Sequence, residues 1–337
     1  MGSRERQLIE RGWSPSRIED YIRALPIWRG EPVLEPLIGG MQNSSYTVTD
    51  ETGKRVARLG FDNAHLGTVQ TSVLACARAA AEIGISPPIT HYEPNLFVMD
   101  FIEGRVLSEE EIADPAVVGR IIDKLFAPLH AGSHAVRDPA VYFDGFLCVR
   151  NHARYGLESD SPHHSRIPEV IEVIDKIEPV IEPYRPVFSH NDCAHVNVML
   201  DHSDRLWLID WDFGGFNHPL WDIAELCAYA VSDEALDRFA LERSLGAFDE
   251  ATMTQRLREH RAFKLASYLR QVTWCILQDC EGSRSDEDAA RSMTRAFPDE
   301  DAEDSYEGFM ELAWGRYRDL WQTCRDDYGS GPKKGDF

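Results

Sequence analysis

The sequence is short of basic residues: 35 lysines and arginines stand against 57 aspartates and glutamates, for a formal net charge of −22. Nucleic acids and anionic membranes bind through basic patches, so this shortage argues against both as main partners. The charge suits a small cationic substrate. The simpler explanation, an acidic protein that is merely soluble, stays open at this point.

Long apolar runs and paired cysteines are also missing. No run approaches the roughly 20 residues of a membrane-spanning helix, and no secretory hydrophobic region is present. The seven cysteines are scattered and lack C-x-x-C spacing. We therefore expect free thiols and a cytoplasmic protein. What is present is a chain of 337 residues with 43% hydrophobic content, enough for two lobes and a sizeable core.

One stretch, residues 188–230, combines acids and an amide at fixed spacing. It holds His190, Asp192 and Asn197 in the pattern H-x-D-x-x-x-x-N, and Asp210 follows in L-I-D-W-D. Between the two aspartates lie two short apolar runs separated by a polar turn, which predicts a β-hairpin. The hairpin would bring two carboxylates and an amide oxygen to one end. Such a donor set suits Mg²⁺, which commonly shares its ligands with substrate phosphates.

This set of side chains is typical of the catalytic core of kinases. Asp192 would accept the proton of the acceptor hydroxyl, while Asn197 and Asp210 would hold the metal that bridges the nucleotide phosphates. The alternative is a hairpin whose acids are solvated turn residues. Any one acid alone would favour that alternative, and the complete set favours the kinase interpretation.

The same stretch resembles the choline/ethanolamine kinase family, a relative of the aminoglycoside phosphotransferases. The resemblance rests on His190-Asn191-Asp192-Cys193, on Asn197 and on Ile209-Asp210-Trp211-Asp212, and it runs in order over residues 31–279. It implies an α+β, bilobal, protein-kinase-like fold with ATP and Mg²⁺ as cofactors. A small antiparallel-sheet lobe would span residues 1–102, with a leading helix over 13–25, and a mostly helical lobe would span 103–337. His190 and Asp192 would belong to the catalytic motif, and Asp222 would brace the catalytic loop.

The nucleotide would be covered by the strand-rich residues 33–102. A glycine turn lets the backbone approach phosphates without a Cβ clash, and a basic residue on the third strand pairs with phosphate in this family. The hinge between the lobes meets the adenine edge. A plain hairpin turn and a solvent-facing arginine are the alternatives for the first two features. The implied nucleotide-binding residues are Gly39, Gly40, Gln42, Asn43, Arg58, Met99, Asp100, Phe101 and Ile102.

The sequence departs from the family in the helix predicted over 68–83. That helix normally carries a glutamate that pairs with the basic residue of the third strand, yet no acid occurs between Asp62 and Glu82. Arg58 must therefore find another partner. This departure keeps open a non-catalytic, nucleotide-binding protein.

The acceptor pocket of the family holds an ammonium group against aromatic faces and a carboxylate. The resemblance places Asp212, Phe213, Trp274, Gln271 and Phe309 there. Gln271 replaces a second tryptophan and weakens the aromatic box, and aromatic residues on amphipathic helices more often belong to a core.

We expect an ATP- and Mg²⁺-dependent kinase of choline or ethanolamine, as a monomer or homodimer. A kinase of aminoglycosides or of another small metabolite is the alternative. The acidic stretch 281–304 is expected to be a flexible insertion.

Overall fold

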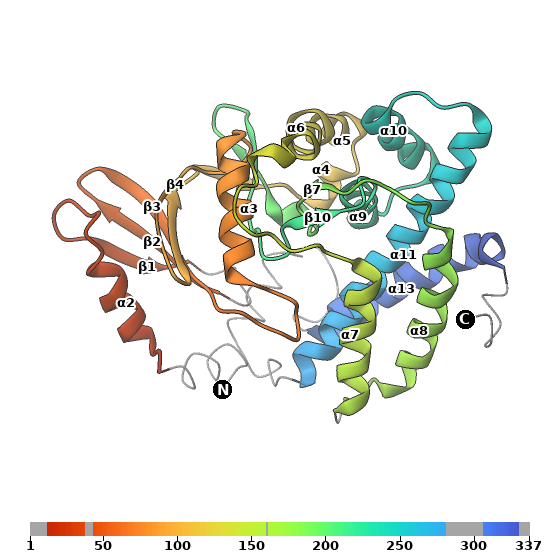
Figure 1. The fold of residues 1–337 in the computed structure, drawn as a ribbon, viewed down its shortest axis with the longest axis horizontal. Coiled ribbons are helices and arrows are strands. Elements are labelled where there is room, and N and C mark those ends of the chain that lie inside the picture. Colours follow the sequence, from red (N-terminus) through yellow and green to blue (C-terminus); the bar gives the residue numbers. More distant parts are fainter. Residues whose placement is uncertain (1–11, 38–42, 160, 281–305, 330–337) are drawn as a thin grey trace.

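The computed structural model of the chain describes residues 12–37, 43–159, 161–280 and 306–329. These residues form a sheet lobe and a helical lobe (Figure 1), which confirms the predicted α+β class and its two lobes. Gly39, Gly40, Gln42 and the acidic stretch 281–304 lie outside the described residues. The predicted lobe boundary after residue 102 falls between a strand that ends at Asp100 and one that begins at Gly104.

The small lobe is an antiparallel sheet with the strand order β1-β2-β3-β5-β4. Because side chains alternate along a strand, Ala57 and Leu59 of β3 face one side of the sheet and Arg58 faces the other. The first pair joins a separate apolar cluster on the outer face, and Arg58 therefore points toward the second lobe. The strands are β1 (Val33–Pro36), β2 (Ser44–Asp50), β3 (Gly53–Leu59), β4 (Ile89–Glu93) and β5 (Leu96–Asp100).

Two helices cover the faces of this sheet. Helix α2 (Pro15–Arg23) is capped by Ser14, whose hydroxyl accepts a hydrogen bond from the amide of Arg17 at 3.2 Å, and its Ile18 and Ile22 are buried against the outer face. Helix α3 (Gln70–Glu82) lies between the sheet and the helical lobe (Figure 1), and its residues pack into the main core. Both predicted helices are confirmed.

The predicted hairpin is also present. Strands β8 (Val198–Asp201) and β9 (Leu206–Leu208) pair antiparallel with Val198 opposite Leu208. Strand β6 (Gly104–Val106) extends this small sheet, and β7 (Val187–Ser189) pairs with β10 (Gly215–Asn217) at the entrance to the catalytic stretch.

The helical lobe is built around α9 and α11. Every residue of α9 is buried, including two acids, and the longer α11 packs against α7, α9 and α13. Ser108 and Glu111 form a capping box at the start of α4. The helices are α4 (Glu109–Ile112), α5 (Pro115–Ile121), α6 (Ala127–Ala131), α7 (Gly145–Glu158), α8 (Ile167–Ile177), α9 (Trp221–Tyr229), α10 (Glu234–Leu245), α11 (Glu250–Cys280) and α13 (Tyr306–Cys324).

The helical run from Pro115 to Ala131 is not regular throughout. A π-helical turn, Ile122–Phe126, separates α5 from α6, and the amide of Ala127 bonds to the carbonyl of Ile122. Pro128 follows directly and has no amide hydrogen for the helix ladder, which gives a physical reason for the widened turn.

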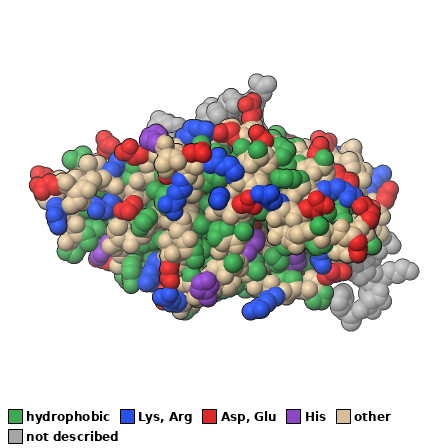
Figure 2. Space-filling model, turned by 90° about the horizontal axis from the view of Figure 1, so that it is seen from above, with side chains coloured by type: hydrophobic (Ala, Val, Ile, Leu, Met, Phe, Trp, Pro, Cys, Tyr) green, Lys and Arg blue, Asp and Glu red, His purple; other side chains and the backbone are tan. Residues whose placement is uncertain are grey.

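Acidic and basic side chains are interspersed across the face drawn in Figure 2. Six cysteines have described side chains and all six are free thiols. Within the described ranges, every helix is too short or too polar to traverse a lipid bilayer.

Candidate active site

The hairpin brings the predicted metal ligands and base to one end. The amide nitrogen of Asn197 donates to Asp192 twice, to the carboxylate Oδ2 at 3.0 Å and to the backbone carbonyl at 2.9 Å. The amide of Ile209 bonds to the carbonyl of Asn197 at 3.0 Å, which fixes the chain one residue before Asp210. Since the Asn197 nitrogen is used, its side-chain oxygen is the atom left to ligate a metal.

Asp222 holds the catalytic loop from below. Its carboxylate is fully buried and accepts hydrogen bonds from the backbone amides of His190 at 3.1 Å and Asn191 at 2.9 Å. His130 adds a third contact at 3.0 Å. Burial opposes ionisation, but these hydrogen bonds and the nearby histidine outweigh it and lower the pKa of Asp222. These contacts are the ones that a residue bracing the catalytic loop requires. The effect of Asp222 on catalysis stays a prediction.

His190 also serves the backbone rather than the cleft. Its Nε2 donates to the carbonyl of Ile209 at 2.9 Å, so the ring connects the catalytic loop to the strand end before Asp210. Asn191, in a left-handed conformation with φ of 67°, donates to the carbonyl of Phe213 at 2.8 Å. The loop that carries Asp192 is therefore fixed on both sides of that residue.

Asp210 stands between the lobes with 40% of its side chain exposed and a left-handed φ of 64°. A non-glycine residue in this region stores strain, which is common at functional sites. Surrounding protein atoms displace water and raise the pKa of Asp210 to about 7; repulsion from Asp212 adds to this effect, and Arg58 opposes it. The exposed carboxylate of Asp210 is an oxygen donor of the kind that a divalent cation prefers.

Arg58 is paired with Asp212, a partner that the sequence could not identify. It forms an ion pair with Asp212, which also accepts a hydrogen bond from Asn43 at 2.7 Å, and it lies 3.6 Å from Asp210. The expectation for Asp212 was an acid in the acceptor pocket. The structure instead places its carboxylate against two residues of the small lobe. The Nη1 of Arg58 is buried and has no partner among the described residues.

The hinge residues Met99, Asp100, Phe101 and Ile102 are half-buried. The amide of Asp100 bonds to the carbonyl of Pro88 at 3.0 Å and the amide of Phe101 to that of Lys54 at 3.4 Å. Among the described residues, the amide of Ile102 makes no backbone hydrogen bond, which leaves it as a donor for an adenine edge.

The predicted aromatic box is only partly assembled. Trp274 and Phe309 meet edge to face with ring centroids 6.5 Å apart. Phe213, however, already carries a cation: the guanidinium of Arg270 lies 5.1 Å from its ring centroid. Gln271 is buried, and its side-chain oxygen has no hydrogen-bond partner within the described part of the chain. The acceptor side therefore differs from a cage of aromatic faces alone.

Sequence reasoning missed two charged residues beside the base. Arg270 lies 2.8 Å from Asp192 and 2.7 Å from Glu225, and its side chain is only 5% exposed. Burial raises the pKa of Glu225 to about 7, although the charge of Arg270 works in the opposite direction. The available signal was a charged residue within otherwise apolar helical sequence: Glu225 follows Asp222 by three positions, on one helix face.

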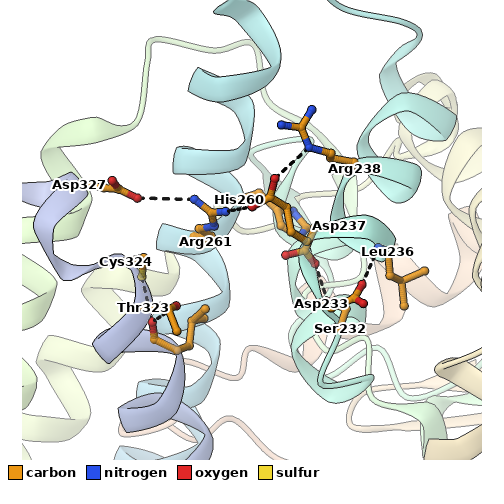
Figure 3. Close-up of polar contacts among 12 residues, drawn as sticks. Ser232, Asp233, Leu236, Asp237, Arg238, His260, Arg261, Thr323, Cys324 and Asp327 are labelled. Carbon is orange, nitrogen blue, oxygen red and sulfur yellow. Dashed lines mark hydrogen bonds and ion pairs between the residues drawn. The ribbon is translucent and has the colours of Figure 1, made fainter. Parts of the chain in front are cut away.

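A second polar cluster lies away from this site, between α10 and α11 (Figure 3). Cys227 of α9, Asp237 of α10 and His260 of α11 are buried and close enough for their ligating atoms to share a metal ion; Figure 3 shows Asp237 and His260. Lys264 already supplies a positive charge to this cluster, with its ammonium 3.0 and 3.1 Å from the two oxygens of Asp237. Burial also raises the pKa of the Cys227 thiol to about 12, which keeps it protonated. The cluster is a buried ion pair.

The sequence is similar to those of known phosphotransferases. The profile of the family described as "Phosphotransferase enzyme family" (APH) matches residues 33–262. Protein LicA of Haemophilus influenzae is 25% identical over 249 residues, which cover 71% of this chain and 70% of LicA.

Solved structures share the fold. A choline/ethanolamine kinase family protein from Mesorhizobium loti superposes with a TM-score of 0.66 at 22% identity and covers 92% of this chain and 97% of its own. A LicA structure in complex with AMP superposes with a TM-score of 0.65 at 16% identity and covers 93% of this chain and 98% of its own. Because the family profile covers more than half of the residues, the chain belongs to the phosphotransferase enzyme family.

Proposed function

We propose that this phosphotransferase moves the γ-phosphoryl group of ATP to the hydroxyl of a small amino alcohol such as choline or ethanolamine. The observation that carries the proposal is the convergence of Asp192, Asn197 and Asp210 at one end of a hairpin, on a loop braced by Asp222. The similarity to choline/ethanolamine kinase structures supports the choice of acceptor.

The reaction needs a positioned base and an open path between donor and acceptor. The acceptor hydroxyl gives its proton to Asp192 while its oxygen forms a bond to the γ-phosphorus; the bond from that phosphorus to the β,γ-bridging oxygen breaks, and ADP leaves. Asp192 suits this task because its carboxylate is 22% exposed and oriented by Asn197.

The side chains that would hold Mg²⁺ are Asp210, through its carboxylate, and Asn197, through its amide oxygen. When bound there, Mg²⁺ supplies positive charge that offsets the charge of the phosphates. Arg58 contributes from the small lobe, because its buried Nη1, which has no partner in the described part of the chain, is a donor suited to a phosphate oxygen.

The acceptor side favours an amine that carries N–H groups. The side-chain oxygen of Gln271 is a hydrogen-bond acceptor without a partner among the described residues, and leaving a buried acceptor unsatisfied is unfavourable. A primary ammonium can donate to it, whereas a trimethylammonium group cannot. Ethanolamine therefore fits the described residues better than choline, and an aminated sugar would satisfy the same atom.

An ATP-consumption assay with Mg²⁺ tests the proposal over choline, ethanolamine, aminoglycosides and neutral sugars. Ethanolamine or choline should stimulate turnover, and Asp192→Asn should lower kcat by at least about a hundredfold while ATP still binds. Asp204→Asn, in the exposed turn of the same hairpin, is the matched control and should behave as the wild type. If only aminoglycosides stimulate turnover, the acceptor is an aminoglycoside and the proposed amino alcohol is wrong. If no acceptor stimulates turnover, the result indicates a non-catalytic nucleotide-binding protein.

A further inference from the structure

Arg270 reaches the catalytic loop from α11, far away in the sequence. Its Nη2 lies 2.8 Å from the Oδ1 of Asp192 and 2.7 Å from the Oε1 of Glu225. One guanidinium nitrogen therefore bridges the base of the reaction and a fully buried acid of α9.

Glu225 is itself tied to the catalytic loop. Its other oxygen accepts the backbone amide of Cys193 at 2.8 Å, the residue directly after Asp192. Ser267 of α11 lies 3.5 Å from Oε1, on the helix that carries Arg270. The glutamate thus fixes the loop backbone and the arginine together, and the ring of Phe213 covers the guanidinium at 5.1 Å.

The two oxygens of Asp192 have separate partners as a result. Asn197 donates to Oδ2 and Arg270 donates to Oδ1. Two donors from different elements fix the plane of a carboxylate, whereas one would leave it free to rotate about its last bond. Each oxygen retains a lone pair that can receive a proton.

A purely structural ion pair explains these contacts less well. The Nε of Arg270 is buried and has no partner among the described residues, an unfavourable state that a stabilising pair would avoid. By contrast, Arg261 on the same helix pairs with the surface acids Glu234 and Asp327 (Figure 3). Burial of the Arg270 guanidinium is unfavourable because it removes the charge from water, and the contact with Asp192 is what this burial makes possible.

We propose that Arg270 is a positioning residue, held in place by Glu225, that fixes the carboxylate of Asp192 in the orientation in which it receives the acceptor's proton. This assignment rests on the proposed kinase function and deepens it. Arg270 acts through Asp192 and takes no part in bond making or breaking.

The test compares Arg270→Ala and Arg270→Lys with the control Arg261→Ala in the full-length chain, with the acceptor that the panel identifies. Misplacing a reacting group by about 1 Å costs about a hundredfold in rate, so we expect a loss of that size in kcat for Arg270→Ala. KM for ATP should stay within about twofold of the wild type, because the nucleotide side is untouched. Added guanidinium ion at low millimolar concentration should restore part of the kcat, which a merely structural role would not allow.

Glu225→Gln supplies a second, independent measurement. If Glu225 acts through Arg270, its substitution lowers kcat in the wild type by about tenfold and has little further effect when Arg270 is already alanine. If Arg270→Ala does not fold, the kcat values of Arg270→Lys and Glu225→Gln test the assignment instead. Both variants keep a polar side chain of similar size.

Three results would overturn the assignment: a kcat for folded Arg270→Ala close to that of Arg261→Ala, no rescue by guanidinium, or losses from Arg270 and Glu225 that simply multiply. An unaltered kcat in both Arg270→Lys and Glu225→Gln would also overturn the assignment. A wild type without turnover on any acceptor would overturn the kinase proposal, and this role with it; an active wild type with an unaffected Arg270→Ala would remove only the role of Arg270.

Discussion

Asp237→Asn should be one of the most destabilising single changes at a polar residue of the helical lobe. Asp237 and Lys264 are only 4% and 2% exposed, and their charged atoms lie 3.0 Å apart. Lys264 also donates to the carbonyl of Ser232 at 2.9 Å. Removing one charge leaves the other buried without its partner, which costs about 3–5 kcal/mol. Typical domains have only about 5–15 kcal/mol of stability, so the effect is large.

The assay is urea denaturation followed by tryptophan fluorescence. With an m-value of about 3 kcal/mol/M, the loss should lower the unfolding midpoint by about 1–2 M. The double variant Asp237→Leu/Lys264→Met should be more stable than the single one, because replacing both charges by apolar groups removes the unpaired ammonium. Asp327→Asn, at an exposed pair with Arg261 (Figure 3), should cost less than about 1 kcal/mol. A cost below about 1 kcal/mol for Asp237→Asn would refute the reasoning.

The same pair predicts a pH dependence. Burial opposes the charge of Asp237, but His260, Lys264 and Ser232 outweigh it and hold the pKa of this carboxyl well below its usual range. A lowered pKa stabilises the fold above the unfolded value of about 3.9, and the contribution disappears as pH falls further toward the folded pKa. The difference in unfolding free energy between wild type and Asp237→Asn should therefore be full at neutral pH and shrink below about pH 4. A constant difference down to pH 3 would contradict this assignment.

Three further changes test other parts of the structure. Asp222→Asn turns one acceptor of the catalytic loop into a donor, so kcat should fall by at least about tenfold with KM for ATP nearly constant; steady-state kinetics would refute the brace if kcat were unchanged. Asp212→Asn weakens the contacts to Arg58 and Asn43 and should raise KM for ATP more than it lowers kcat. A change in the acceptor KM alone would instead indicate that Asp212 lies in the acceptor pocket. Ser108→Ala removes the cap of α4 and should cost about 1 kcal/mol in thermal unfolding, and no shift in Tm would count against it.

The sequence alone determined the features that depend on neighbours along the chain. The hairpin around Asp201 follows from two apolar runs and a polar turn, and the spacing of Asp192, Asn197 and Asp210 places them at one end of it. The capping box of α4 and the cap of α2 follow in the same way. In each case the partners lie within one turn or one hairpin, so local pattern is sufficient.

Only the tertiary structure decided how the buried charges are paired. Arg270 lies 78 positions from Asp192, and Arg58 lies 154 positions from Asp212. A lone charge in an apolar helix indicates that some partner exists, because a buried charge must be compensated. It does not say which partner, since several acids compete and the choice depends on how the helices and the two lobes pack. That packing placed Asp212 against two residues of the small lobe and put the guanidinium of Arg270 against the ring of Phe213, where a substrate ammonium was expected.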